Sequence, residues 1–242
     1  MITDAAQLSV GGFKVEVVRK PIKNLHLGVY PPHGRVRVAA PLEMGDEAVR
    51  LAVVTRLAWI KRQQAKFAAQ PRQSERRYIS GETHFFLGQR YRLNLIEGAR
   101  AGQVRVRNRK TIDLRVREGS DLAIRERVFL DWYRRELSAR ARPVVERWAA
   151  EYRIATPTWG IKRMKTKWGT CNIEARRVWL NLELIKKPPQ CLEYVIVHEL
   201  AHFFERNHTE QFVGLLDRML PQWRIVRDEL NAEPLAHEDW GV

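Results

Sequence analysis

Apolar and polar residues alternate in short runs over the first forty positions of the chain. The segments FKVEVVRKP, NLHLGVYP and RVRVAAP follow this alternation and are bounded by Pro, Gly or Asn. A period of two residues is typical of strands with one buried face, and the bounding residues favour turns. The pattern therefore predicts a β-rich start to the chain.

The period changes after Gly45, where apolar residues recur every three or four positions as far as about Ala69. This spacing predicts one helix, which Pro71 helps to end. The residues on its predicted apolar face are Val49, Val53, Leu57, Ile60 and Phe67.

A second set of alternating segments follows: HFFLG, YRLNLIEG, QVRVRN and TIDLRVRE. The last two predict a hairpin with one buried face and one face rich in arginine. The apolar positions of this hairpin are Val104, Val106, Ile112, Leu114 and Val116. The arginines of the opposite face are Arg105, Arg107, Arg115 and Arg117.

The second half of the chain begins with a long helical pattern that Asp121 can cap and that runs to about Tyr152. Short strands are predicted at TWGIKRM, TKWGTCN and RVWLNLEL, and Pro188-Pro189 precedes a further helix. We expect RVWLNLEL to be an edge strand that can pair with an extended peptide. These elements predict an α+β fold. Residues 1–120 would form a basic, β-rich α/β region and residues 121–242 a second unit, or the two would pack as one domain.

Composition narrows the class of protein. The chain has 242 residues, of which 45% are apolar, enough for a substantial core. Its two cysteines, Cys171 and Cys191, give no disulfide framework, which suits a reducing compartment. The N-terminus does not resemble a secretory signal, and no run approaches about 18 apolar residues. We expect a cytoplasmic protein without a membrane partner.

The net charge of +15 is concentrated in the first half. Residues 1–120 hold 23 Lys and Arg against 10 Asp and Glu, whereas residues 158–242 hold 12 of each. A basic surface attracts anionic partners such as nucleic acid or acidic polypeptides. A merely solubilising surface explains the same excess.

The segment VIVHELAHFFERNH carries the candidate chemistry. If residues 190–206 form a helix, His198 and His202 project from one face and can bind one zinc ion. Glu199 is then placed to take a proton from a water at the open metal position. Ordinary polar residues on a helix are the competing interpretation.

A catalytic zinc needs a third protein ligand. His208 follows His202 by six residues, far enough for the helix to end and the chain to turn back. Asn207 resembles a helix cap with Glu210 three residues later. We therefore expect His208 at the start of a second helix, facing the metal. Glu205, expected on the first helix, and a residue more distant in the sequence are the alternative ligands.

Several other residues carry weaker signals. Tyr194 lies four residues before His198 and is a candidate to stabilise an oxyanion. Lys167 or Asn172 could orient a substrate, although a packed turn explains their segment equally well. Cys171 is expected to fill apolar space. The remaining histidines are isolated in sequence and expected at the surface or in loops: His26, His33, His84 and His237.

The segment VIVHELAHFFERNHTEQFVGLLDRMLPQW closely resembles the YgjP-like metallopeptidases, which are related to small gluzincin-like proteases and to the SprT and WLM protease domains. KTKWGTCN and RVWLNLELIKKPP also resemble motifs of that family, with Lys167 where arginine is frequent and Thr170 where serine is usual. The resemblance is sharpest from about Ile161 to Trp223. It implies a zincin-like unit with Zn²⁺ on His198, His202 and His208, and Glu199 as general base.

Two hypotheses follow. The first is a zinc metallopeptidase that hydrolyses polypeptide substrates. The second is a protein that associates with nucleic acid through its basic N-terminal half and whose zinc site is structural or vestigial. The arginine-rich hairpin favours the second, but the sequence shows no nucleic-acid recognition motif.

Overall fold

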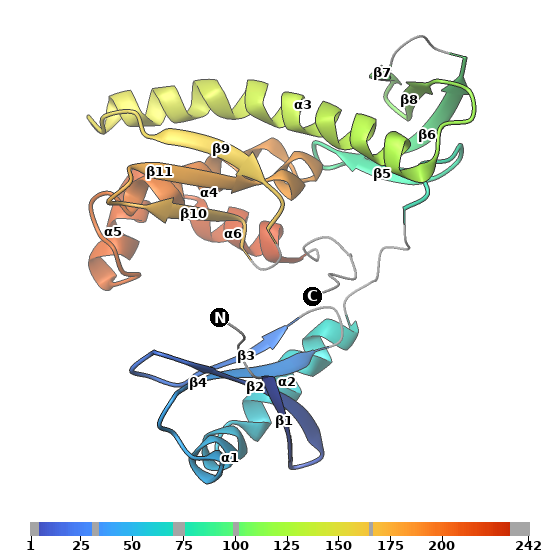
Figure 1. Cartoon of the computed structure of the whole chain (residues 1–242). Coiled ribbons are helices and arrows are strands. Elements are labelled where there is room, and N and C mark those ends of the chain that lie inside the picture. The colour runs from blue at the N-terminus through green and yellow to red at the C-terminus, as the bar shows by residue number, and fades with distance from the viewer. Residues whose placement is uncertain (1–4, 31–33, 70–75, 99–101, 165–166, 233–242) are drawn as a thin grey trace. The chain divides into compact units, whose positions relative to one another are not determined.

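The computed structural model describes residues 5–30, 34–69, 76–98, 102–164 and 167–232 (Figure 1). The chain divides into two compact units, one within Met1–Gln73 and the other within Ser74–Ala236. The division comes after Gln73, whereas the sequence pattern placed a boundary near residue 120. Helices and mixed sheets occur in both halves, which confirms the predicted α+β class.

A four-stranded sheet and two helices form the first unit. The sheet has the order β1-β2-β4-β3, with β2 and β4 parallel and the other pairs antiparallel. Alternate valines of the strands pack against Val49, Val53 and Ile60 of the helices. The elements are β1 (Ala5–Val10), β2 (Phe13–Lys20), β3 (His26–Tyr30), β4 (Arg35–Pro41), α1 (Asp46–Val54) and α2 (Leu57–Ala69).

The expectation of one helix from Gly45 to Ala69 was wrong, because the chain breaks after α1. Thr55 ends that helix, and its hydroxyl donates a hydrogen bond to the carbonyl oxygen of Ala52 at 3.1 Å. Such a local bond competes with the helical pattern. The apolar spacing survives the break because both helices turn apolar residues to the same sheet.

The second unit opens with another four-stranded sheet, of order β5-β6-β8-β7. Its apolar face packs on α3 (Leu122–Glu151), whose first turn is capped as predicted: Asp121 Oδ1 accepts from the N–H of Ile124 at 2.8 Å. Because this sheet and α3 share one core, the strands belong with the second unit and the boundary lies before them. The strands are β5 (Thr83–Phe86), β6 (Gln89–Glu97), β7 (Gln103–Asn108) and β8 (Thr111–Val116).

The predicted hairpin is formed by β7 and β8. Val104, Ile112 and Leu114 are buried, as the alternation required. Asp113, which the alternation also places on the arginine-rich face, lies opposite Arg105 and pairs with Arg107 at 2.9 Å.

A three-stranded sheet of order β10-β11-β9 lies beside the last three helices (Figure 1). The strand predicted as an edge, β11 (Arg177–Asn181), is the central strand, so that prediction was wrong. The alternation along this segment shows which side chains share a face of the strand. It does not show which strands lie on either side, because strand order depends on contacts with distant segments. Among the described residues, the edge strands of this sheet are β10 (Gly169–Asn172) and β9 (Thr158–Lys162).

The approach to the histidine helix is fixed from two sides. A 3₁₀ turn, η1 (Leu182–Lys186), joins β11 to α4 (Pro189–Ala201). The turn after β5 donates backbone hydrogen bonds to the last two carbonyl groups of η1. Glu193 of α4 accepts bonds from Trp148 Nε1 at 3.0 Å and from Arg147, both on α3. Two further helices complete the unit: α5 (Glu210–Met219) and α6 (Trp223–Ala232).

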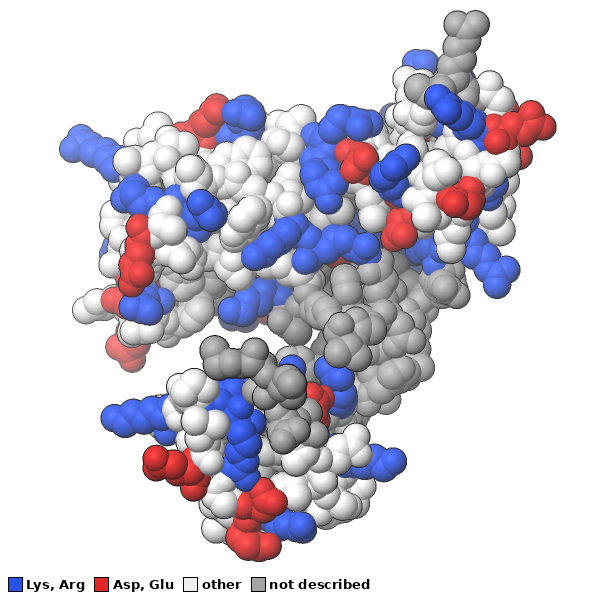
Figure 2. Space-filling view, in the orientation of Figure 1, with Lys and Arg blue, Asp and Glu red and all other residues white. Residues whose placement is uncertain are grey.

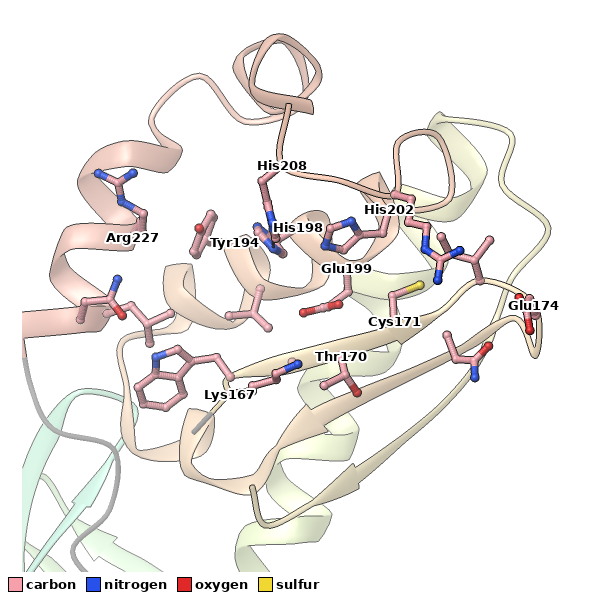
Figure 3. A pocket seen from close by; sticks show the side chains of 18 residues that line it. Lys167, Thr170, Cys171, Glu174, Tyr194, His198, Glu199, His202, His208 and Arg227 are labelled. Atoms are coloured by element: carbon pink, nitrogen blue, oxygen red, sulfur yellow. Dashed lines mark hydrogen bonds between the residues drawn. The ribbon is translucent and has the colours of Figure 1, made fainter. Parts of the chain in front are cut away.

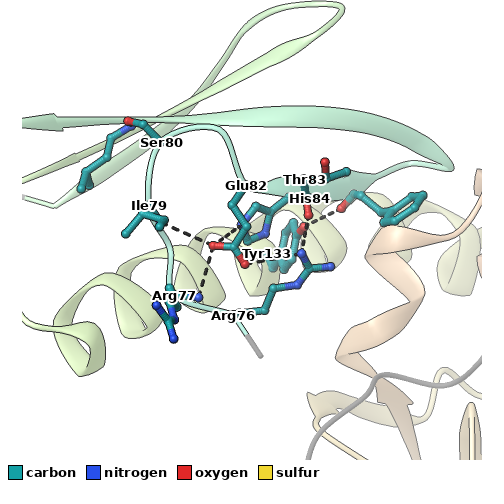
Figure 4. Close-up of polar contacts among 10 residues, drawn as sticks. Arg76, Arg77, Ile79, Ser80, Glu82, Thr83, His84 and Tyr133 are labelled. Carbon is teal, nitrogen blue, oxygen red and sulfur yellow. Dashed lines mark hydrogen bonds and ion pairs between the residues drawn. The ribbon is translucent and has the colours of Figure 1, made fainter. Parts of the chain in front are cut away.

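A polar cluster joins the start of the second unit to its core (Figure 4). The Glu82 carboxylate accepts from the backbone N–H of Arg77 at 3.2 Å and from Arg76 Nη1 at 3.4 Å. His84 lies 3.6 Å from the same carboxylate and is buried, so the expectation of a surface or loop histidine was wrong there. His26 is exposed on β3, whereas His33 and His237 lie outside the described residues.

Within the part of the chain that the structure describes, no helix has the length and apolar character needed to cross a membrane.

Candidate functional site

The helix α4 places the first two histidines. Its other faces are apolar, with Val195, Ile196 and Leu200 buried, which fixes the helix in the core. His198 lies in its last turn and His202 is its C-cap residue, with ring centroids 5.1 Å apart. The i, i+4 spacing therefore brings the two rings together as predicted.

The helix is shorter than the predicted span of residues 190–206. It ends at Ala201, and the following turn is tightened by backbone bonds from Phe203 to Leu200 and from Phe204 to Ala201. His202 Nδ1 lies 3.1 Å from the carbonyl oxygen of Glu205. This early end turns the chain back towards α4.

The third histidine stands directly before α5. The cap of that helix is Thr209, whose hydroxyl accepts from the N–H of Phe212 at 3.4 Å, so the prediction of Asn207 as cap was wrong. Asn207 instead donates its backbone N–H to Glu205 Oε1 at 3.0 Å. The buried Phe212 ring lies 4.8 Å from the ring of His208 and contacts both other histidines.

The three imidazoles converge on one point (Figure 3). Each offers a nitrogen, and these nitrogens all lie within 4.8 Å of one another. The Nε2 atoms of His198 and His208 are 3.0 Å apart. Among the described residues, this cluster contains only the three histidines, and Glu205, the alternative ligand, is not part of it.

Two of the three histidines, His198 and His202, have the neutral form that a metal ligand needs. Burial, together with the nearby His202 and His208, lowers the pKa of His198 to about 3, so this ring is neutral. Burial also lowers the pKa of His202, and its contact with the Glu205 carbonyl places the proton on Nδ1, which leaves Nε2 as a free lone pair. Nitrogens that share a tetrahedral zinc ion lie roughly 3.3 Å apart, close to the 3.0 Å seen here. The residues therefore fit a metal ion.

Glu199 lies beside this cluster, 5% exposed. Burial raises its pKa to about 8, and the charge of Lys167 acts in the opposite direction. Its carboxylate packs against the backbone of Gly169, where an added Cβ would lie 2.5 Å from Oε1. The site can therefore hold Glu199 in this place only if residue 169 has no side chain.

A cavity of about 750 Å³ contains these groups. One wall is the segment from Lys167 to Glu174, which includes all of β10, and the other is formed by α4 and α6. In Figure 3 the Lys167 side chain extends towards Glu199. The edge strand β10 therefore lines the same cavity as the three histidines.

The weaker candidates also lie in this cavity. Tyr194 lines it, with its ring 5.9 Å from that of His198 and stacked on Trp223. Burial raises the pKa of Tyr194, so its hydroxyl is a neutral donor. Burial raises the pKa of Cys171 to about 11, with Glu199 adding to the effect, so its thiol is protonated.

Sequence reasoning missed the role of Gly169. Its contact with Glu199 joins positions thirty residues apart, and the only local signal was a glycine next to Trp168 at the start of a strand.

The described residues around β7 and β8 carry both signs of charge. On the face shown in Figure 2, Lys and Arg are interspersed with Asp and Glu over the second unit. The ion pairs Arg107–Asp113 and Arg125–Glu97 contribute to this mixture.

Comparison with known proteins adds a family. The chain is similar to two solved structures, both crystal structures of metallopeptidase zymogens. Abylysin of Pyrococcus abyssi is 15% identical, with a TM-score of 0.36, and the match covers 38% of this chain and 92% of that one. Jannalysin of Methanocaldococcus jannaschii is 22% identical, with a TM-score of 0.34, and the match covers 37% of this chain and 92% of that one. No curated protein sequence matches the chain.

The family model described as "YgjP-like, metallopeptidase domain" matches residues 23–233, which is most of the chain. A metallopeptidase uses a metal cofactor and acts on polypeptides, and the described residues place three histidines in position to hold such a metal. The chain belongs to the YgjP-like metallopeptidase family.

Proposed function

We propose that the protein is a zinc-dependent peptidase with His198, His202 and His208 as metal ligands and Glu199 as general base. The observation that carries the proposal is the convergence of three imidazole nitrogens beside one buried carboxyl group. Three imidazoles with an open fourth position are typical of catalytic zinc, whereas a closed structural site needs a fourth protein ligand. Among the described residues, no fourth His, Cys, Asp or Glu joins the cluster.

The metal, when bound, supplies a Lewis acid that polarises a peptide carbonyl and lowers the pKa of water. Glu199 borders the same cavity as the histidines, and its ionised form would take the proton of the attacking water. A cation held by the histidines would favour that ionised form against the burial that raises the pKa of Glu199 to about 8. After attack, the protonated Glu199 donates that proton to the leaving amine. Tyr194 lines the cavity, and its neutral hydroxyl would donate a hydrogen bond to the oxyanion.

We infer that an extended substrate binds along the outer edge of β10. A polypeptide segment that pairs with this edge would receive backbone hydrogen bonds and pass directly in front of Glu199. This replaces β11, which the sequence had suggested for the same task.

Metal analysis tests the ligand set. We expect about one zinc per chain in the wild type and a large loss in His208→Ala. His26→Ala is the matched control, because this exposed histidine belongs to the other unit and should leave the metal content unchanged. Full zinc occupancy in His208→Ala would contradict the three-histidine site.

A peptidase assay tests the reaction. Internally quenched peptides with varied sequences should be cleaved by the wild type in a zinc-dependent manner, with no cleavage after chelation and recovery on adding zinc. Zinc that binds tightly without any hydrolysis would favour a structural site instead.

A further inference from the structure

Asn181 ends β11 and is fully buried. Its side-chain nitrogen donates hydrogen bonds to the carbonyl oxygens of Met164 and Lys167, each at 2.8 Å. Its side-chain oxygen accepts from the N–H groups of Met164 at 3.3 Å and Glu183 at 3.2 Å. A carboxamide has two donor hydrogens and two principal acceptor positions, so this one uses its full capacity.

Three of these bonds go to the segment before β10, and the backbone of Asn181 adds a fourth, because its N–H donates to the carbonyl oxygen of Trp168 at 2.9 Å. Three residues before β10 are thus bound to one asparagine: Met164, Lys167 and Trp168. The next residue along the chain is Gly169, at the start of β10.

Lys167, Trp168 and Gly169 form the rim of the cavity beside Glu199. The Lys167 side chain extends towards that carboxylate in Figure 3, and Gly169 leaves no room for a methyl group beside it. A small displacement of Gly169 towards α4 would therefore push Glu199 out of place. A displacement of Gly169 away from α4 would widen the gap between its backbone and the Glu199 carboxylate.

We propose that Asn181 is a positioning residue that holds the rim segment Lys167–Gly169 in register with Glu199, and so controls the rate of the chemical step. The inference rests on the proposed function, in which Glu199 is the base. Asn181 touches neither the histidine cluster nor the cavity, since it is absent from the cavity wall and acts through the backbone of the rim.

Other side chains cannot replace this amide. Aspartate keeps the acceptors but loses both donors, and it would turn a carboxylate towards two carbonyl oxygens in a buried site. Glutamine keeps the two donor hydrogens and two acceptor positions of the carboxamide but adds a methylene. It can therefore form the same hydrogen bonds only if the backbone of the rim moves.

The experiment compares Asn181→Asp and Asn181→Gln with the wild type. We expect zinc content to stay at the wild-type level and kcat to fall at least about tenfold, because displacements near 1 Å cost up to about a hundredfold in rate. KM should change by much less than kcat. Asn108→Asp is the matched control: Asn108 Oδ1 only accepts, from the N–H of Lys110 at 2.9 Å, in the exposed turn after β7, and aspartate can do the same.

A second measurement needs no activity. Amide hydrogen exchange at Met164 should be faster in Asn181→Gln, which displaces the oxygen that accepts from this N–H, and unchanged in Asn108→Asp. Wild-type kcat in either folded Asn181 variant overturns the proposal, and so does unchanged exchange at Met164 in Asn181→Gln. A kcat loss accounted for wholly by lost zinc or by an unfolded fraction also overturns it, because Asn181 would then be structural only.

The two proposals fail in different ways. If wild-type protein with zinc hydrolyses no peptide, or Glu199→Gln is as active as the wild type, the proposed function fails. The exchange measurement still reports whether Asn181 holds the rim.

Discussion

A methyl group on residue 169 would occupy space that the Glu199 carboxylate now fills. The added Cβ of Gly169→Ala would lie 2.5 Å from Oε1, 2.8 Å from Cγ and 2.9 Å from Cδ of Glu199, whereas ordinary contacts begin at 3.4 Å. The carboxylate would have to retreat by about 0.9 Å, the difference between 2.5 and 3.4 Å. A catalytic group displaced by about 1 Å costs roughly a hundredfold in rate. We therefore predict a loss of about a hundredfold in kcat/KM with little change in zinc content.

The assay measures cleavage of an internally quenched peptide, zinc per chain and thermal unfolding on the same preparations. Gly214→Ala is the matched control, because a Cβ on this α5 glycine meets no atom within 4 Å. The control should keep full activity and gain about 0.5–1 kcal/mol of stability, since alanine is the better helix former. Wild-type kcat/KM in zinc-loaded Gly169→Ala would refute the reasoning that this contact sets the position of the base.

Three further outcomes are expected. Glu199→Gln should retain zinc but lose at least about a hundredfold in kcat, because an amide cannot accept a proton, and Glu210→Gln, an exposed residue of α5, should not. Glu82→Gln should lower the free energy of unfolding at pH 7 by about 1–3 kcal/mol in urea melts. Burial raises the pKa of Glu82, but the contact with His84, the charges of His84 and Arg76 and a backbone hydrogen bond together lower it to about 2. The stabilisation is therefore complete above about pH 4.5 and is lost towards pH 2, so the gap between variant and wild type should close over that range; a gap independent of pH would contradict this. Asp121→Ala should cost about 1 kcal/mol in the same melts by removing the cap of α3, and an unchanged midpoint would show that the cap is not needed.

Local patterns predicted most elements of the fold because their causes are local. Asp121 caps α3 and Pro189 starts α4, as chain chemistry requires at helix ends. β1 was missed because AAQLSV contains only two strongly apolar residues. The end of α4 at Ala201 was also missed, since helix-forming residues continue beyond it and a tight turn takes over.

The site was predictable to the extent that it follows helix geometry. The spacing of His198 and His202 places both rings on one face of α4 whatever surrounds it. The approach of His208 depends on a turn and on Phe212, and sequence suggested it only through the following helical pattern. The contacts of Glu199 with Gly169 and of Asn181 with Met164 join distant positions through strand order, which no local pattern contains.

The shortness of β10 has a consequence for the proteins that the enzyme can cut. Four residues form this strand, so its free edge extends for roughly 13 Å at about 3.3 Å per residue. A chain segment that pairs there must first give up its own backbone hydrogen bonds. We expect cleavage of a folded protein to follow the population of its locally opened state, slowing about tenfold for each 1.4 kcal/mol of added local stability. A series of destabilised variants of one target protein would reveal this dependence, and equal cleavage rates across the series would exclude it. The folding of the target, rather than its sequence alone, would then decide where and how fast it is cut.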